Sequence, residues 1–208
     1  MKEKIVYSDI FKSAWKGFLA QIWLLTGLVI GFTIIFSLLI LFVIPDKGEV
    51  VRIGGLIVSI LCICLGSLFS LGYLRNCMQT LDGEEPQFSA YGQESRKLLS
   101  FLVAYILFSV IITVGFALFI FPGVYLFLRF QFFFASMVDE DTGLITSFKR
   151  SWEMTKGYQL QLLVLLFIHL LIFLIGMMAL CIGVFAAIPL SALLYGSVYR
   201  KLTAPVVQ

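Results

Sequence analysis

The hydrophobic positions of this chain fall into long apolar runs separated by short polar segments. Six runs are apolar enough for membrane-crossing helices, namely residues 18–44, 53–73, 99–121, 124–138, 160–180 and 184–199. A helix crosses a hydrocarbon core about 30 Å thick with about 20 residues. Residues 159–199 have no polar break, and one helix of that length would be about 60 Å long. We therefore expect the chain to fold back near Gly183, and Phe121-Pro122-Gly123 to form a similar turn.

Short amphipathic segments precede the odd-numbered runs. "FKSAWKG" before the first run and "FKRSWEM" before the fifth share the pattern Phe-Lys-x-x-Trp, and "FSAYGQESRK" before the third is a weaker copy. Their aromatic residues share one helical face, opposite the basic residues. Such helices lie in the membrane interface, with cations near anionic headgroups. The predicted anchors are Phe11, Trp15, Phe148 and Trp152.

This repetition predicts an all-α integral membrane protein built from three similar units. Each unit would be a cytoplasmic interfacial helix followed by a transmembrane hairpin, over residues 8–75, 86–139 and 143–201 of one membrane domain, 1–208. The alternative is that basic and aromatic residues flank the spans without a true repeat.

Composition supports membrane insertion, and the basic residues give an orientation. The 208 residues are 61% hydrophobic and 13% charged, whereas soluble domains carry about 25% charged residues. With the N-terminus inside, the outer segments hold only Lys47 and Arg52, and Arg129 lies within a span. The inner segments hold Lys2, Lys4, Lys12, Lys16, Arg75, Arg96, Lys97, Lys149, Arg150, Lys156, Arg200 and Lys201. This excess predicts cytoplasmic termini.

Arg129 is a charged residue in the apolar fourth run. A mid-membrane charge costs about 2.5–3.5 kcal/mol on insertion scales, so its side chain should point into the helix bundle. Residues of the second and sixth spans that lie at the same predicted membrane depth as Arg129 include several hydroxyl side chains, which are its predicted partners. The predicted polar centre comprises Arg129, Ser67, Ser70, Ser191 and Tyr195. Two roles fit it: an internal clasp between spans two, four and six, or a site for an anionic solute.

The sequence contains little that indicates catalysis. No Asp or Glu lies within a predicted span away from its ends, and His169 is the only histidine. A lone histidine on an apolar helix is more often a packing residue than a catalyst. The acidic triplet Asp139-Glu140-Asp141 is better explained as a solvated stop signal than as a cation site. We expect no enzymatic activity, cofactor or metal.

Three regions of the chain resemble a bacterial family. They are "FPGVYLFLRFQFFFASMVDEDTGLITSFKRSWEMTKGYQLQLLVLLF", "LGYLRNCMQTLDGEEPQFSAY" and "IGVFAAIPLSALLYGSVYRKL". This is the YciC-like group of uncharacterised integral membrane proteins, which is similar to the membrane domain of some glycerophosphoryl diester phosphodiesterases. The resemblance implies six helices and a bacterial inner membrane. It implies no activity.

Two functions therefore remain as expectations. The first is a non-enzymatic inner-membrane protein that organises lipids or partner proteins through its interfacial helices. The second is a small transporter or channel that binds an anionic solute at Arg129. The expected partners are membrane lipids and other membrane proteins, and we expect no nucleic-acid partner. The oligomeric state is not indicated by the sequence.

Overall fold

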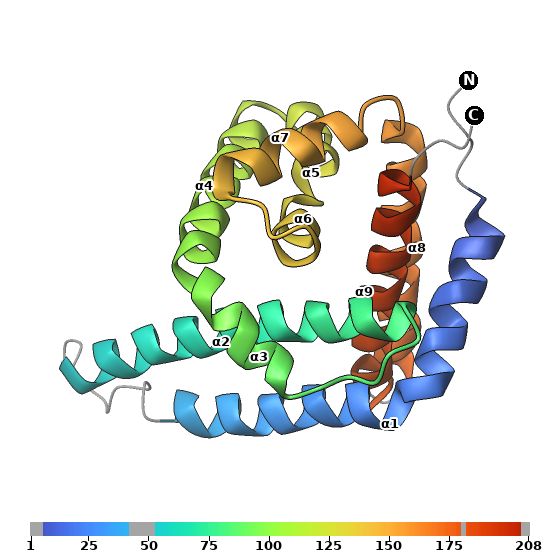
Figure 1. Ribbon diagram of the computed structural model, residues 1–208. Helices are drawn as coiled ribbons and strands as arrows, with labels where there is room; N and C mark the ends of the chain where they lie inside the picture. The colour runs from blue at the N-terminus through green and yellow to red at the C-terminus, as the bar shows by residue number, and fades with distance from the viewer. Residues whose placement is uncertain (1–5, 42–52, 180–181, 205–208) are drawn as a thin grey trace.

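The computed structural model describes residues 6–41, 53–179 and 182–204, which form helices and contain no strand. The helices are α1 (Tyr7–Ile40), α2 (Ile53–Leu81), α3 (Ser89–Glu94), α4 (Leu98–Leu118), α5 (Ile120–Phe130), α6 (Phe133–Asp139), α7 (Leu144–Met154), α8 (Gln159–Met178) and α9 (Ile182–Thr203), with a 3-10 turn at Ser95–Lys97. Figure 1 shows α1 and α2 side by side, and α8 beside α9.

Within the part of the chain that the structure describes, five segments are long and apolar enough to cross a membrane. They are Tyr7–Ile40, Gly55–Leu81, Ser89–Leu118, Ile120–Asp139 and Gln159–Met178, and they contain or overlap the first five predicted runs. The expectation of an all-helical, membrane-embedded protein is thus confirmed. The sixth predicted run, 184–199, lies within α9, which is not one of these five.

Helix α1 combines the first predicted surface helix and the first predicted span. Its backbone leaves helical geometry at Gln21, where φ is −126° and ψ is 23°. The part before Gln21 runs beside α9 and the part after it runs along α2, so α1 is bent (Figure 1). The N-terminal part packs through small residues: Ala14 is buried, and a Cβ at Gly17 would lie 3.4 Å from Thr80. Surface segment and span are therefore one kinked helix.

The turn between the third and fourth runs differs from the prediction. Helix α4 ends at Leu118, Phe119 is extended, and α5 begins at Ile120. Pro122 and Gly123 therefore lie in the first turn of α5 and do not form the connection. Proline is tolerated there because the first amides of a helix have no intrahelical acceptor. Gly123 instead allows close packing, since a Cβ on Gly115 would lie 3.0 Å from its Cα.

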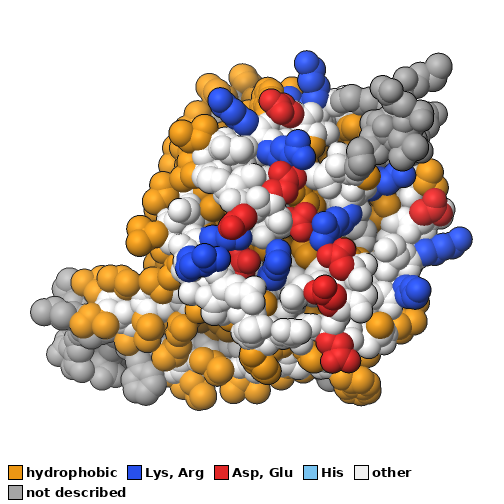
Figure 2. Space-filling view, in the orientation of Figure 1, with side chains coloured by type: hydrophobic (Ala, Val, Ile, Leu, Met, Phe, Trp, Pro, Cys, Tyr) orange, Lys and Arg blue, Asp and Glu red, His pale blue; other side chains and the backbone are white. Residues whose placement is uncertain are grey.

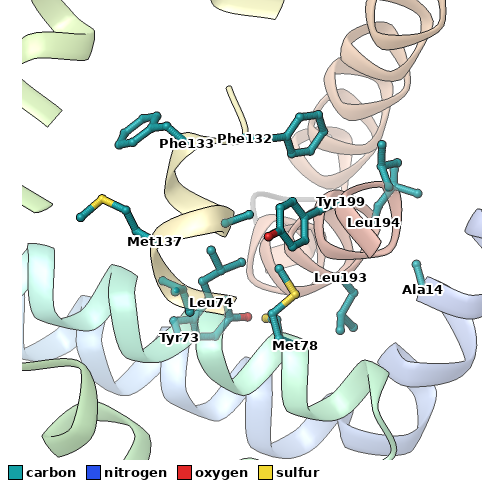
Figure 3. Close-up of a cluster of buried hydrophobic side chains, with 14 of the residues drawn as sticks. Ala14, Tyr73, Leu74, Met78, Phe132, Phe133, Met137, Leu193, Leu194 and Tyr199 are labelled. Carbon is teal, nitrogen blue, oxygen red and sulfur yellow. The ribbon is translucent and has the colours of Figure 1, made fainter. Parts of the chain in front are cut away.

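The core forms where α2, α6 and α9 meet. Figure 3 shows Phe132 pointing toward Tyr199 and Leu194 of α9, while Phe133 points to the opposite side. Phe132 stacks on Tyr195 with ring centroids 5.0 Å apart, and Phe133 stacks on Phe148 of α7 at 4.9 Å. The short α6 segment is thereby held between α9 and α7.

The turn between α8 and α9 depends on close glycine packing. A Cβ on Gly176 would lie 3.0 Å from the carbonyl oxygen of Gly183 and 3.1 Å from Cβ of Ala187. Small residues of this kind let membrane helices approach closely. Residues 180 and 181, next to the predicted fold-back near Gly183, lie outside the described residues.

Replacing Gly176 with leucine should push α8 and α9 apart and lower stability by about 1–3 kcal/mol, the usual cost of overpacking. Thermal unfolding of the purified protein in detergent measures the loss. The matched control is Gly31→Leu, because a Cβ at Gly31 meets nothing within 4 Å. Equal melting temperatures for the two variants would contradict the close packing.

Candidate functional site

The fourth predicted span is broken near its middle. Helix α5 ends at Phe130 and α6 begins at Phe133, with Gln131 and Phe132 between them. Broken helices are tolerated at membrane depth only where other groups bond the released backbone atoms. The break is therefore the point in the fold whose polar groups most need partners.

Hydroxyl groups from α7 and α9 supply those partners. Ser151 donates to the carbonyl oxygen of Arg129 at 2.8 Å and accepts from the amide of Phe132 at 3.2 Å. Thr155 also donates to the Arg129 carbonyl, at 3.2 Å. From α9, Tyr195 donates to the carbonyl oxygen of Gln131 at 2.7 Å. These bonds join both sides of the break to two further helices.

The buried face of α7 is polar, whereas the sequence drew attention to the aromatic face of this segment. On the predicted aromatic face Trp152 is 37% exposed, and Ile145 is 69% exposed. Ser147, Ser151 and Thr155, spaced four residues apart, are buried with Phe148. Sequence reasoning missed these hydroxyls and Gln131. Their small-residue spacing, which is typical of close contacts between membrane helices, was the available signal.

Arg129 points into the protein and stacks on α7. Its side chain is buried, with Cζ 3.9 Å from the ring centroid of Trp152 and 5.9 Å from that of Tyr125. Nε and Nη1 have no hydrogen-bond partner within the described residues. A desolvated cation over a tryptophan face gains about 2 kcal/mol, which offsets part of the cost of burying the charge. Trp152, predicted as a lipid anchor, is thus also the partner of Arg129.

The structure divides the predicted polar centre. Ser70, Ser191 and Tyr195 line one cavity of about 620 Å³, whereas Arg129 and Ser67 are not among its lining residues. The Arg129 atoms Nε and Nη1 donate to none of the four predicted hydroxyl partners. Three of the four predicted hydroxyl residues, Ser70, Ser191 and Tyr195, thus line one cavity, whereas helix α5 turns Arg129 toward α7. The clasp described by these contacts joins α5 to α7 and does not involve spans two and six.

The cavity lies among α2, α4, α5, α6, α8 and α9. Aromatic rings form much of its lining, and its polar groups include His169, Gln131, Ser191 and Tyr195. His169 lies on α8 with Nδ1 2.8 Å from the Leu165 carbonyl oxygen and Nε2 3.1 Å from that of Ser191. A neutral ring donates to one of these two carbonyls, and donation from Nε2 to the Ser191 carbonyl links α8 to α9.

The acidic triplet after α6 is paired with three basic residues. Asp139 lies 3.1 Å from Arg200, Glu140 3.1 Å from Arg150, and Asp141 2.8 Å from Lys97. Lys97 also donates to the Met137 carbonyl at the end of α6. Its hydrogen bond and charge lower the pKa of Asp141. The triplet therefore connects α6 to α7, to α9 and to the start of α4, a role beyond the predicted solvated stop signal.

The predicted anchors fall into two groups. Phe11 and Trp15 on α1 are both 42% exposed and stack with centroids 6.0 Å apart. Phe148 is buried against Phe133, and Trp152 contacts Arg129. The first pair faces the surroundings of the protein, while the second pair also holds the break in place.

Comparison with protein-family models, curated proteins and solved structures finds no match to this chain. The resemblance to the YciC-like group therefore stays a prediction.

Replacing Ser151 with alanine should lower the free energy of unfolding by about 1–3 kcal/mol, because it leaves the buried Phe132 amide without an acceptor. Thermal unfolding in detergent measures the effect. Ser109→Ala is the control, since the Ser109 hydroxyl is exposed and bonds only to its own helix. That control should stay within about 0.5 kcal/mol of the wild type. Matching behaviour of the two variants would exclude the role given to Ser151.

Arg129 and Trp152 should be energetically coupled. A double-mutant cycle of Arg129→Leu and Trp152→Leu is expected to give a coupling free energy of about 1–2 kcal/mol. Trp23, which is 90% exposed, supplies the control cycle, with expected coupling near zero. Arg129→Lys should also destabilise, because an ammonium does not stack as a planar guanidinium does. Equal coupling free energies in the two cycles would show that stacking of Arg129 on Trp152 contributes nothing to stability.

Proposed function

We propose that this chain is a non-enzymatic, multi-pass protein of the bacterial inner membrane that organises lipids at the cytoplasmic surface. One observation carries the proposal. Figure 2 shows a face on which many charged side chains gather, with apolar side chains along its edges. A protein with one charged face and apolar sides fits a bilayer in which that face meets water and headgroups.

The ion pairs on this face support the proposed orientation. Arg200 near the end of α9 lies 2.6 Å from Asp82, just after α2, and 3.1 Å from Asp139 at the end of α6. Lys97, just before α4, pairs with Asp141. These contacts bring together the ends of α2, α6 and α9 and the start of α4. The basic residues of the sequence predict that all four lie on the cytoplasmic side. In this arrangement α9 is the sixth span and both termini are cytoplasmic.

The proposed architecture is three transmembrane hairpins, each after an interfacial segment. The hairpins are α1 with α2, α4 with the broken α5–α6 segment, and α8 with α9. The second and third have close glycine contacts near their turns, Gly115 with Gly123 and Gly176 with Gly183. These matching contacts support a repeat.

Topology reporters test this arrangement. Fusions after Glu85 and Gly157 should report the cytoplasm, as should a fusion after Gln208, whereas one after Gly48 should report the periplasm. Gly48 and Gln208 lie outside the described residues. A periplasmic signal at Gln208 would contradict the sixth span.

Lipid organisation is attributed to exposed lysines beside the aromatic anchors. Lys12 and Lys16 flank Trp15 on α1, and Lys149 lies on the exposed side of α7. Basic residues near an anionic surface contribute about 1 kcal/mol each. The anchors set depth, and the lysines would select anionic headgroups.

Changing these three lysines to glutamine should weaken retention of phosphatidylglycerol over phosphatidylcholine, by roughly fivefold per residue. Native mass spectrometry of protein released from mixed-lipid nanodiscs measures that ratio. The control carries Glu84→Gln and Glu85→Gln, two exposed acids after α2. Wild-type protein that retains both lipids equally would contradict the proposed function.

The second candidate, an anion carrier that uses Arg129, is favoured by one observation: Nε and Nη1 of this buried guanidinium have no partner within the described residues. Under this candidate, phosphate stabilises the wild type thermally and leaves Arg129→Leu unchanged, and liposomes show protein-dependent anion flux. Under the lipid-organising function, neither effect occurs.

A further inference from the structure

The cavity of about 620 Å³ between the helices has the size of a small-molecule site. Ligand cavities in proteins span about 300–1,000 Å³ and combine apolar walls with a few polar groups. Here the apolar part includes Phe101, Phe108 and Phe134. The polar part of the lining determines which ligand end group the cavity can bind.

Four polar residues of the cavity are connected to one another, and Ser70, Tyr73 and Tyr105 also line it. Ser191 and Tyr195 lie one turn apart on α9, His169 approaches the Ser191 carbonyl, and Tyr195 donates to the Gln131 carbonyl. They therefore form one polar patch where α8 and α9 meet the break in the fourth span.

With His169 neutral, no charged side chain occurs among the described residues that line the cavity. An ionised ligand group would lose its hydration there without an opposite charge, which costs several kcal/mol. Arg129, the nearest cation in sequence to Gln131, points to α7 instead. The occupant that fits the cavity is therefore uncharged.

The hydrogen bonds of the polar patch define the end group further. The Tyr195 hydroxyl gives its proton to the Gln131 carbonyl, and the Gln131 side-chain amide donates to the Leu128 carbonyl at 3.2 Å. The amide oxygen of Gln131 and a lone pair of the Tyr195 oxygen remain as acceptors, while the second amide N–H of Gln131 and lining hydroxyls such as that of Ser191 are donors. A hydroxyl matches this mixture, because it is uncharged and both donates and accepts.

We propose that this cavity binds one uncharged lipid alcohol, whose hydroxyl donates to Tyr195 or Gln131 and whose hydrocarbon chain lies among the phenylalanine rings. The surrounding bilayer supplies such molecules, and burial of their chains contributes about 25 cal/mol per Å². This site is independent of the anionic headgroups proposed to bind the charged face.

Photocrosslinking of the full chain in nanodiscs tests the proposal with three diazirine probes: hexadecanol, its methyl ether, and palmitate. Hexadecanol should label peptides that contain cavity residues of α8 and α9, and excess unlabelled hexadecanol should remove the signal. The ether should label about fivefold less, the equivalent of one hydrogen bond of about 1 kcal/mol. Palmitate should label least.

Ala192→Phe, which fills the cavity, should abolish labelling by hexadecanol. Leu170→Phe is the control, because Leu170 is exposed on α8 and does not line the cavity. If Ala192→Phe does not fold, the wild-type protein still tests the proposal. The two measurements are then competition by unlabelled hexadecanol and the positions of the labelled peptides.

Three results would overturn the proposal. Equal, uncompeted labelling by all three probes would show surrounding lipid only, and preferential labelling by palmitate would exclude an uncharged ligand. Full labelling of a folded Ala192→Phe variant would place the ligand elsewhere. None of these outcomes depends on the retention of phosphatidylglycerol, so the two proposals fail separately.

Discussion

The arrangement of this protein depends on how the break between α5 and α6 is satisfied. Two backbone carbonyls and one amide at the break bond to the hydroxyls of Ser151, Thr155 and Tyr195. In an apolar environment each unpaired group would cost several kcal/mol. The break is therefore compatible with a membrane protein only if α7 and α9 pack against it. That requirement brings together segments that are distant in the sequence.

Several other features follow from this packing. Because α7 must reach the break, Trp152 lies over the Arg129 guanidinium and Phe148 lies against Phe133. Because α9 must reach it, Tyr195 becomes part of the cavity wall and Arg200 meets the acids that follow α2 and end α6. One backbone constraint thus links α7, the cavity and the charged face.

The apolar runs predicted the helical, membrane-embedded fold because hydrophobicity over about 20 residues is a strong signal of a span. The inward direction of Arg129 was also predictable, from the cost of a charge in lipid. Its stacking on Trp152 was not, because helix rotation around a break cannot be read from spacing on an unbroken helix. The same limit explains why Ser191 and Tyr195 were grouped with Arg129 but line a cavity without it. Ser147, Ser151 and Thr155 were missed because the prediction for α7 rested on its conspicuous aromatic and basic residues.

The most direct test of this account is hydrogen exchange at the amide of Phe132, resolved by fragmentation of labelled peptides from nanodisc-embedded protein. This amide donates to the Ser151 hydroxyl across the break. The account predicts slow exchange in the wild type and at least about tenfold faster exchange in Ser151→Ala, the equivalent of about 1.4 kcal/mol, with the amides of α8 unchanged. Equal exchange of the Phe132 amide in the two proteins would contradict the claim that hydroxyls from α7 hold the break.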